Sequence, residues 1–163
     1  IEQSQLEEDL QRVGIAFDSN VWLALAFLKH QHREQAQNYL AGLTKDSMAL
    51  FCRATEQSWL RLITAPALHR AYDFATITNH NAIEILNRWH SDPRVGRIES
   101  EPPGTRQLWL KLADRNTASP KLWMDAYLAA FAISGQLRFV TADKDFRQFQ
   151  ASGLDLHLLK SEI

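Results

Sequence analysis

The sequence predicts an α/β fold in three layers, with a mainly parallel central sheet between two layers of helices. Short apolar segments of strand length recur along the chain, and helical segments separate them. Alternating strands and helices favour parallel pairing, because each helix carries the chain back to the start of the next strand. The chain has 163 residues, 45% of them hydrophobic, which fits one domain with its own core.

The first half of the chain supplies two of the predicted strands. Residues 4–13 are predicted to form a short helix, opened by the capping box Ser4-Gln5-Leu6-Glu7 and closed at Gly14. The elements expected after it are a buried strand at residues 15–17, helices at 20–28 and 33–43, a strand at 48–52, and a helix that contains residues 56–63 and ends before Pro66.

The second half begins with an amphipathic helix at residues 79–90. Residues 92–103 are loop-like, with an edge strand at 97–99. The elements expected after this loop are a helix at 105–115, a helix that starts at Ser119-Pro120 and ends at Gly135, and strands at 137–141 and 154–159. The chain contains no internal repeat, low-complexity tract or interdomain linker.

Bulk composition excludes several classes of protein. The single cysteine, Cys52, rules out an internal disulfide framework. The longest apolar run, Val21 to Leu28, is too short to span a bilayer, and the polar, acidic N-terminus does not resemble a signal peptide. We therefore expect a cytoplasmic protein without a membrane partner. The formal net charge of −1 neither indicates nor excludes a nucleic-acid partner.

Acidic residues follow three of the predicted strands. Asp18 comes directly after the first strand, Asp143 follows the strand that contains Phe139 and Val140, and Glu56 lies in the first turn of the helix after residues 48–52. The carboxyl ends of parallel strands meet at one edge of the sheet, where ligands gather. Asp125 differs, because it lies within a helix whose neighbouring positions on the same face are apolar.

Each acid also has a purely structural explanation. Asp18 could cap the helix that follows it, Glu56 could complement a helix dipole, and Asp143 could cap a short helix or sit in a turn. Asp125 has no such explanation unless a nearby lysine or arginine pairs with it. The interpretation as one functional site rests on all four acids together, three of them at strand ends and one on an apolar helix face.

Converging carboxylates repel one another, so a cluster of them needs a cation. Oxygen ligands alone favour hard divalent ions such as Mg²⁺ or Mn²⁺. A site of this kind suits phosphodiester hydrolysis, because the ion activates water and neutralises charge on the scissile phosphate.

Four segments in order carry a resemblance to a known family: FDSNVWLALA, ATEQSWLRLIT, MDAYLAAFAI and FVTADKDF. HQHREQAQNYL, after the first helix, is also similar to members of that family. Together they resemble a PIN-domain ribonuclease of the VapC toxin type, over roughly residues 15 to 160. The resemblance implies a parallel sheet between helices, in agreement with the fold predicted above.

The resemblance assigns roles to eight residues. The catalytic, metal-binding acids would be Asp18, Glu56, Asp125 and Asp143, and Asp145 would be a further metal ligand. Asn20 and Thr141 match small polar positions that would hold the acids by hydrogen bonds. Arg61 matches a family arginine that would contact RNA phosphate or form a structural ion pair. Apart from the resemblance, Lys144 is a further candidate for a basic rim around the site.

The function implied is that of a Mg²⁺- or Mn²⁺-dependent endoribonuclease. It would be the toxin of a toxin–antitoxin pair, acting on structured RNA such as tRNA or rRNA and pairing with a VapB-type antitoxin. A homodimer is expected from the family, from the apolar residues 21–28 and from the tryptophan-rich stripes.

Two alternatives remain at this point. One is a PIN-fold interaction protein without catalysis. The other is a small phosphatase or receiver-type domain, which the lack of a matching lysine and phosphoacceptor arrangement disfavours.

One departure from the family is that residues 1–13 precede the first strand. We therefore expect residues 1–14 to be an N-terminal extension, or a piece of another protein joined in front, and residues 15–163 to be the nuclease domain.

Overall fold

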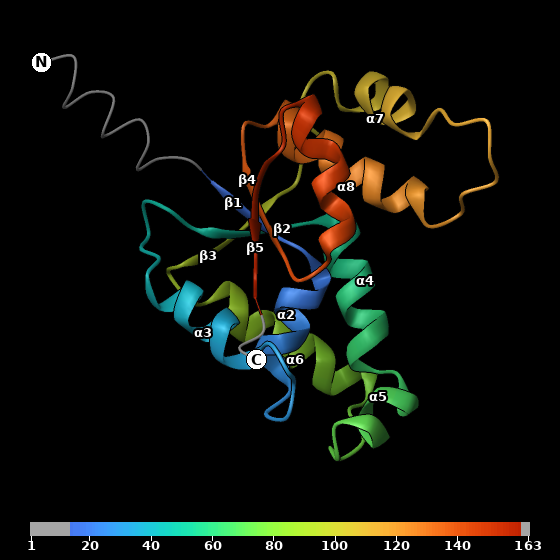
Figure 1. Cartoon of the computed structure of the whole chain (residues 1–163). Coiled ribbons are helices and arrows are strands. Elements are labelled where there is room, and N and C mark those ends of the chain that lie inside the picture. The colour runs from blue at the N-terminus through green and yellow to red at the C-terminus, as the bar shows by residue number, and fades with distance from the viewer. Residues whose placement is uncertain (1–13, 161–163) are drawn as a thin grey trace, which may run out of the picture.

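A computed structural model describes residues 14–160, and its centre is a five-stranded sheet in which every strand pair is parallel (Figure 1). The strands are β1 (Ile15–Phe17), β2 (Ala49–Cys52), β3 (Val95–Ile98), β4 (Arg138–Thr141) and β5 (Asp155–Leu158). Their order in the sheet is β3-β2-β1-β4-β5. The predicted α/β fold with a parallel sheet is confirmed.

Helices cover both faces of this sheet. They are α2 (Ser19–Ala26), α3 (Arg33–Ala41), α4 (Arg53–Ile63), α5 (Pro66–Ala71), α6 (Asn79–His90), α7 (Thr105–Ala113), α8 (Leu122–Ser134) and the 3-10 helix η1 (Lys144–Ser152). Figure 1 shows α2, α3 and α6 on one side of the sheet and α7 and α8 on the other. The two helical layers make the three-layer architecture that the sequence predicts.

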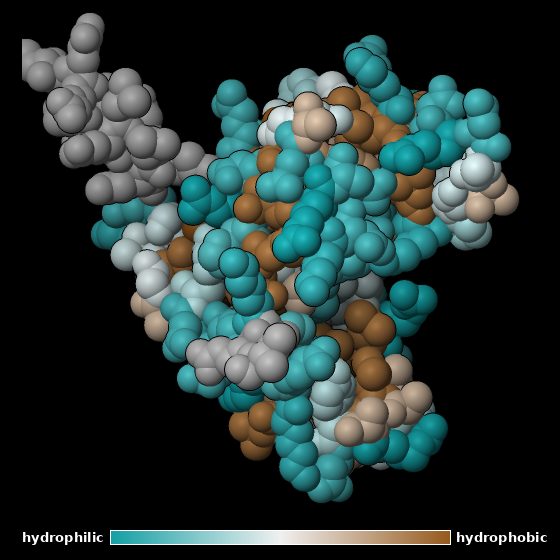
Figure 2. All heavy atoms as spheres, viewed as in Figure 1, coloured by the Kyte–Doolittle hydropathy of each residue, from teal (hydrophilic) through white to brown (hydrophobic). Residues whose placement is uncertain are grey.

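Each face of the sheet has its own apolar core. On the face covered by α2, Trp22 is fully buried and stacks on Phe51, with ring centroids 3.8 Å apart. On the other face Phe139 packs against Phe146 of η1 at 4.7 Å. The surface seen in Figure 2 is largely hydrophilic. No helix within residues 14–160 has both the length and the apolar character needed to cross a membrane.

The structure differs from the sequence prediction at three places. Pro66 does not only end a helix, because it also opens the short helix α5 as its first residue. Ser119-Pro120 does not start α8, which begins at Leu122 after a turn in which the Leu122 amide donates to the Ser119 carbonyl. Residues 144–152 form η1, where a short helix was expected only as one structural explanation of Asp143.

The remaining elements lie within a few residues of their predicted positions. The edge strand expected at residues 97–99 is β3, and it pairs with β2. The helix expected at residues 4–13 lies outside the described residues.

Candidate active site

The site forms at the topological switch point of the sheet, where the order of successive strands reverses. After β1 the chain builds β2 and β3 on one side, and it returns to place β4 on the other side of β1. The carboxyl ends of β1 and β4 therefore lie side by side, which is the position where ligands bind in open α/β sheets. Asp18 follows β1, and Asp143 stands two residues after the end of β4. The Asp18 amide donates to the Val140 carbonyl at 2.9 Å, which joins the two strand ends.

Hydrogen bonds hold the Asp18 carboxylate in one orientation. Oδ1 accepts from the Ser19 amide at 2.7 Å, so Asp18 is the N-cap of α2. Oδ2 accepts from the Thr141 hydroxyl at 2.8 Å and from Asn20 Nδ2 at 3.2 Å. The carboxylate is buried, and this burial raises its pKa although the bonds from Thr141 and Ser19 oppose the shift. The carboxylate that caps α2 is thus also the predicted metal ligand.

Asn20 and Thr141 connect the two strand ends a second time. Asn20 Nδ2 also donates to Thr141 Oγ1 at 3.0 Å, and Asn20 Oδ1 accepts from the Ala142 amide at 3.1 Å. Thr141 Oγ1 accepts in turn from the Asp143 amide at 3.0 Å. The two side chains therefore fix the orientation of Asp18 and the backbone that leads into Asp143.

Asp143 ends β4 and begins η1. Its Oδ1 accepts from the Asp145 amide at 2.9 Å and caps the 3-10 helix, as its structural explanation expects. Its Oδ2 lies 3.0 Å from Lys121 Nζ, which also approaches Asp145 Oδ2 at 2.8 Å and Asp125 Oδ2 at 3.9 Å. One ammonium thus faces three carboxylates, and these contacts raise the pKa of Lys121. In this arrangement Lys121 is the cation that the acid cluster needs.

Asp125 approaches the cluster from the opposite layer. It lies in the first turn of α8, and its neighbours Leu128, Ala129 and Ala132 are buried, as the apolar pattern predicts. Its side chain is 14% exposed. Burial is the main reason why the pKa of Asp125 rises to about 6. Asp143 and Asp18 raise it further, and Lys121 opposes the shift.

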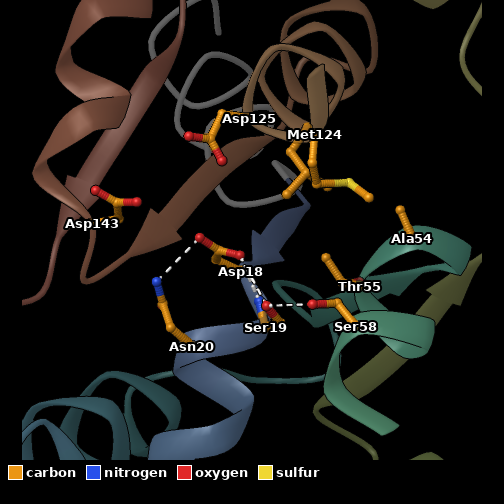
Figure 3. Close-up of a pocket in the computed structure, with 10 residues that line it drawn as sticks. Asp18, Ser19, Asn20, Ala54, Thr55, Ser58, Met124, Asp125 and Asp143 are labelled. Carbon is orange, nitrogen blue, oxygen red and sulfur yellow. Dashed lines mark hydrogen bonds between the residues drawn. The ribbon is translucent and has the colours of Figure 1, made fainter. Parts of the chain in front are cut away.

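The three acids Asp18, Asp125 and Asp143 line one cavity of about 200 Å³. Figure 3 shows their carboxylates directed toward the same space. Ser19 and Ser58 lie on another side of this space, and the Ser58 hydroxyl donates to Ser19 Oγ at 3.1 Å. Oxygen atoms therefore dominate the polar lining of the cavity.

The family model for the PIN domain matches residues 15–151. The chain belongs to the PIN domain family. Ribonuclease VapC41 of Mycobacterium tuberculosis is 39% identical over 142 residues, which covers 87% of this chain and 96% of that protein. Ribonuclease VapC44 of the same species is 30% identical over 130 residues, covering 78% of this chain and 84% of that protein. The chain is thus a VapC-type PIN domain.

Two solved structures of VapBC complexes have the same fold. VapBC2 from Rickettsia felis, bound to a DNA fragment from its promoter, aligns with a TM-score of 0.59 over 91% of this chain and 100% of that one. VapBC-1 from nontypeable Haemophilus influenzae aligns with a TM-score of 0.57 over 90% of this chain and 98% of that one. Each is 13% identical to this PIN domain, so the likeness concerns the fold alone.

Glu56 stands apart from the other predicted acids of this PIN domain. It lies in the first turn of α4 and is buried, as expected, but it does not line the cavity that Asp18, Asp125 and Asp143 share. Its carboxylate instead lies close enough to His90 to oppose the lowering of the His90 pKa that burial causes. The lining of this cavity therefore includes three of the four predicted acids, and the place of Glu56 in the site stays a prediction. Its neighbour Thr55 lines the cavity in its place.

The other predicted residues surround the site at different distances from it. Asp145 is 60% exposed and is joined to the acids through Lys121. Arg61 and Lys144 are exposed and do not line the acid cavity. Sequence reasoning missed Lys121, although its position four residues before Asp125 is the spacing of a helical ion pair.

The raised pKa of Asp125 predicts how stability depends on pH in the absence of divalent ions. A carboxyl whose pKa is higher in the folded state contributes stability below about pH 4, and that stability is lost as the pH rises through about 6. With chelator present, we expect the melting temperature of Asp125→Asn, relative to the wild type, to rise as the pH goes from 4 to 6.5. Melting curves of both proteins across this range test the prediction. A constant difference between them would contradict it.

Proposed function

We propose that this VapC-type PIN domain is a Mg²⁺- or Mn²⁺-dependent endoribonuclease whose active site is the acid cavity. The observation that carries the proposal is the meeting of Asp18, Asp125 and Asp143 in one cavity at the carboxyl ends of adjacent strands. The names of the VapC relatives support ribonuclease activity. As the substrate we propose structured RNA such as tRNA or rRNA.

The oxygen donors of the cavity fit a hard divalent cation. Within residues 14–160, no three His, Cys, Asp or Glu side chains stand in a ready metal-binding arrangement. The positive charge among the carboxylates belongs to Lys121. A divalent cation carries twice that charge and prefers the same carboxylate oxygens, so it would compete with the ammonium for them. No group of thiolate and imidazole ligands lines this cavity, which disfavours zinc.

We propose that Asp18, Asp125 and Asp143 hold the cation, with Asp145 beside them. Glu56 stays a predicted ligand on the family resemblance alone. Asn20 and Thr141 would keep Asp18 oriented, because both donate to its Oδ2. When bound, the cation would supply positive charge on the scissile phosphate and make water a better nucleophile. The three carboxylates would hold the cation next to the phosphate oxygens on which negative charge develops. Hydrolysis would add one water across one P–O bond. Arg61 and Lys144 would contact the RNA outside the cavity.

We propose two partners, an antitoxin and a second copy of this chain. Two structural neighbours are VapBC complexes, which supports a VapB-type antitoxin as the partner of this chain and a toxin role for the PIN domain itself. We also propose a homodimer, which light scattering of the isolated protein at micromolar concentration would test.

Residues 15–163 remain the proposed nuclease domain, with residues 1–14 in front of it. A cytoplasmic location agrees with the role of a toxin that acts on RNA.

Incubation of total RNA with the purified protein, followed by mapping of the new ends, tests the ribonuclease function. Cleavage at defined sites is expected in Mg²⁺ or Mn²⁺, and none is expected in excess chelator. If no divalent metal supports cleavage, the alternative of a non-catalytic PIN-fold interaction protein replaces this proposal.

A further inference from the structure

Beyond the acid cavity, a series of hollows follows the segment between α7 and α8. Figure 1 shows this segment swinging outward from the rest of the chain. Asp125 lines both the acid cavity and a second hollow, whose other walls include Arg115 and Gln148. The second hollow shares Arg115, Ser119 and Pro120 with a third one, whose lining also includes Trp123. Because neighbouring hollows share lining residues, they lie next to one another, and we call the second and third hollows together the path.

The middle of the path carries positive charge that is available to a ligand. Arg115 is exposed, and its Nη2 donates to the neutral Oε1 of Gln148 at 3.0 Å. Among residues 14–160, no carboxylate forms an ion pair with it. Lys121, on the same path, is held by the acids instead. Arg115 is therefore the cation on this path that can take up an external anion without breaking an ion pair.

The far end of the path presents a flat aromatic surface. Trp123 is 53% exposed, whereas Trp22 and Trp59 are fully buried, so Trp123 is not a core residue. Trp109 supports it from behind: its Nε1 donates to the Trp123 carbonyl at 2.8 Å, and the two rings meet edge to face at 6.3 Å. Tyr127 packs in turn against Trp109 at 5.5 Å. The exposed indole of Trp123 thus lies on a helix and packs against Trp109, which Tyr127 supports in turn.

We propose that this path binds single-stranded RNA next to the scissile phosphate, with Arg115 on a backbone phosphate and Trp123 stacked on a base. The proposal rests on the ribonuclease function above and adds to it two RNA-contacting residues outside the acid cavity, Arg115 and Trp123. Only unpaired bases can turn their faces to an aromatic side chain, because bases in a duplex stack on one another. An indole beside an arginine, in a groove that leads away from an acid centre, matches this chemistry.

Binding is best measured without turnover, in the full chain carrying Asp143→Asn. The probes are a fluorescein-labelled single-stranded oligoribonucleotide and the same strand in a duplex, followed by fluorescence anisotropy in Mg²⁺. In this background Trp123→Ala should weaken single-strand binding by about 5- to 150-fold, since stacking contributes ~1–3 kcal/mol per base. Trp123→Phe should recover most of the loss. Leu28→Ala, which removes another exposed apolar side chain away from the path, should change nothing.

Arg115→Gln should act differently from Trp123→Ala. Loss of one phosphate contact should lower the slope of log K against log salt concentration by about 1, whatever the sequence of the strand. Duplex binding should respond less than single-strand binding to Trp123→Ala.

Unchanged affinity of both variants for the single strand would overturn the path, even if the wild type cleaves total RNA as proposed. A wild type that cleaves no RNA would overturn the ribonuclease function instead, so the two failures are distinct. A change in molar mass of Trp123→Ala by light scattering, with RNA affinity unaltered, would identify the indole as a protein interface and also overturn the proposal.

Discussion

Replacement of Asp143 by asparagine is expected to lower metal-dependent RNA cleavage by at least about 100-fold while the protein stays folded. Loss of an outer group that only supports a metal ligand typically costs 10- to 100-fold in affinity or activity, so loss of a ligand itself should cost more. The fold should survive, because asparagine can still accept the Asp145 amide and cap η1. Cleavage assays and melting curves of the same preparation test both halves of this prediction.

Asp155→Asn is the matched control for this substitution. Asp155 is an exposed acid on β5 that pairs with Arg138 at 3.2 Å, outside the acid cavity, and its loss should leave cleavage intact. Equal cleavage by Asp143→Asn and the wild type would remove Asp143 from the site. If Asp143→Asn instead unfolds the protein, Asp143 is a structural acid of the turn, and its catalytic role must be withdrawn.

Trp22→Ala is expected to cause the largest loss of stability among single substitutions in the core on the α2 face. Trp22 is fully buried, stacks on Phe51 at 3.8 Å and contacts Phe17 and Trp89 with ring centroids 5.0 and 5.5 Å apart. Truncation of such a side chain costs ~3–5 kcal/mol, a large share of the ~5–15 kcal/mol that stabilises a typical domain. The melting temperature should fall by on the order of 10 °C.

Trp123→Ala provides a comparison with the same change of residue type. Because Trp123 is half exposed, its truncation removes far less buried contact and should lower stability by ~1 kcal/mol or less. Urea denaturation followed by circular dichroism measures both free energies of unfolding. Similar losses for the two variants would show that the Trp22 stack does not stabilise the core as described.

The fold could be predicted from the sequence because its signals are local. Strands such as β4 are short apolar runs that stop at polar residues, and α6 begins and ends where its amphipathic pattern does. Ser119-Pro120 misled the prediction, because the same signal opens either a helix or the turn observed before Leu122. The helix η1 was expected only as one structural explanation of Asp143, because two apolar residues, Phe146 and Phe149, are too few to establish a helical pattern.

The site was predictable only in part, because its geometry depends on contacts between distant segments. Strand-end position is enough to bring Asp18 and Asp143 together once the sheet order is known. Which residues in the first turn of α4 line the cavity depends on the rotation of α4 about its axis, and in the structure Thr55 lines it and Glu56 does not. The reach of Lys121 to Asp143 joins residues 22 positions apart and has no signature in the sequence.

Diffraction from crystals grown with Mn²⁺ tests the central claim most directly, because the anomalous signal of manganese locates the ion without reference to activity. We expect a peak in the acid cavity, about 2 Å from carboxylate oxygens of Asp18, Asp125 or Asp143, with Lys121 withdrawn from Asp143. The same crystals of Asp143→Asn should show a weaker peak or none. A cavity without manganese at saturating concentration, with Lys121 still bound to Asp143 and Asp145, would contradict the proposed metal-dependent active site.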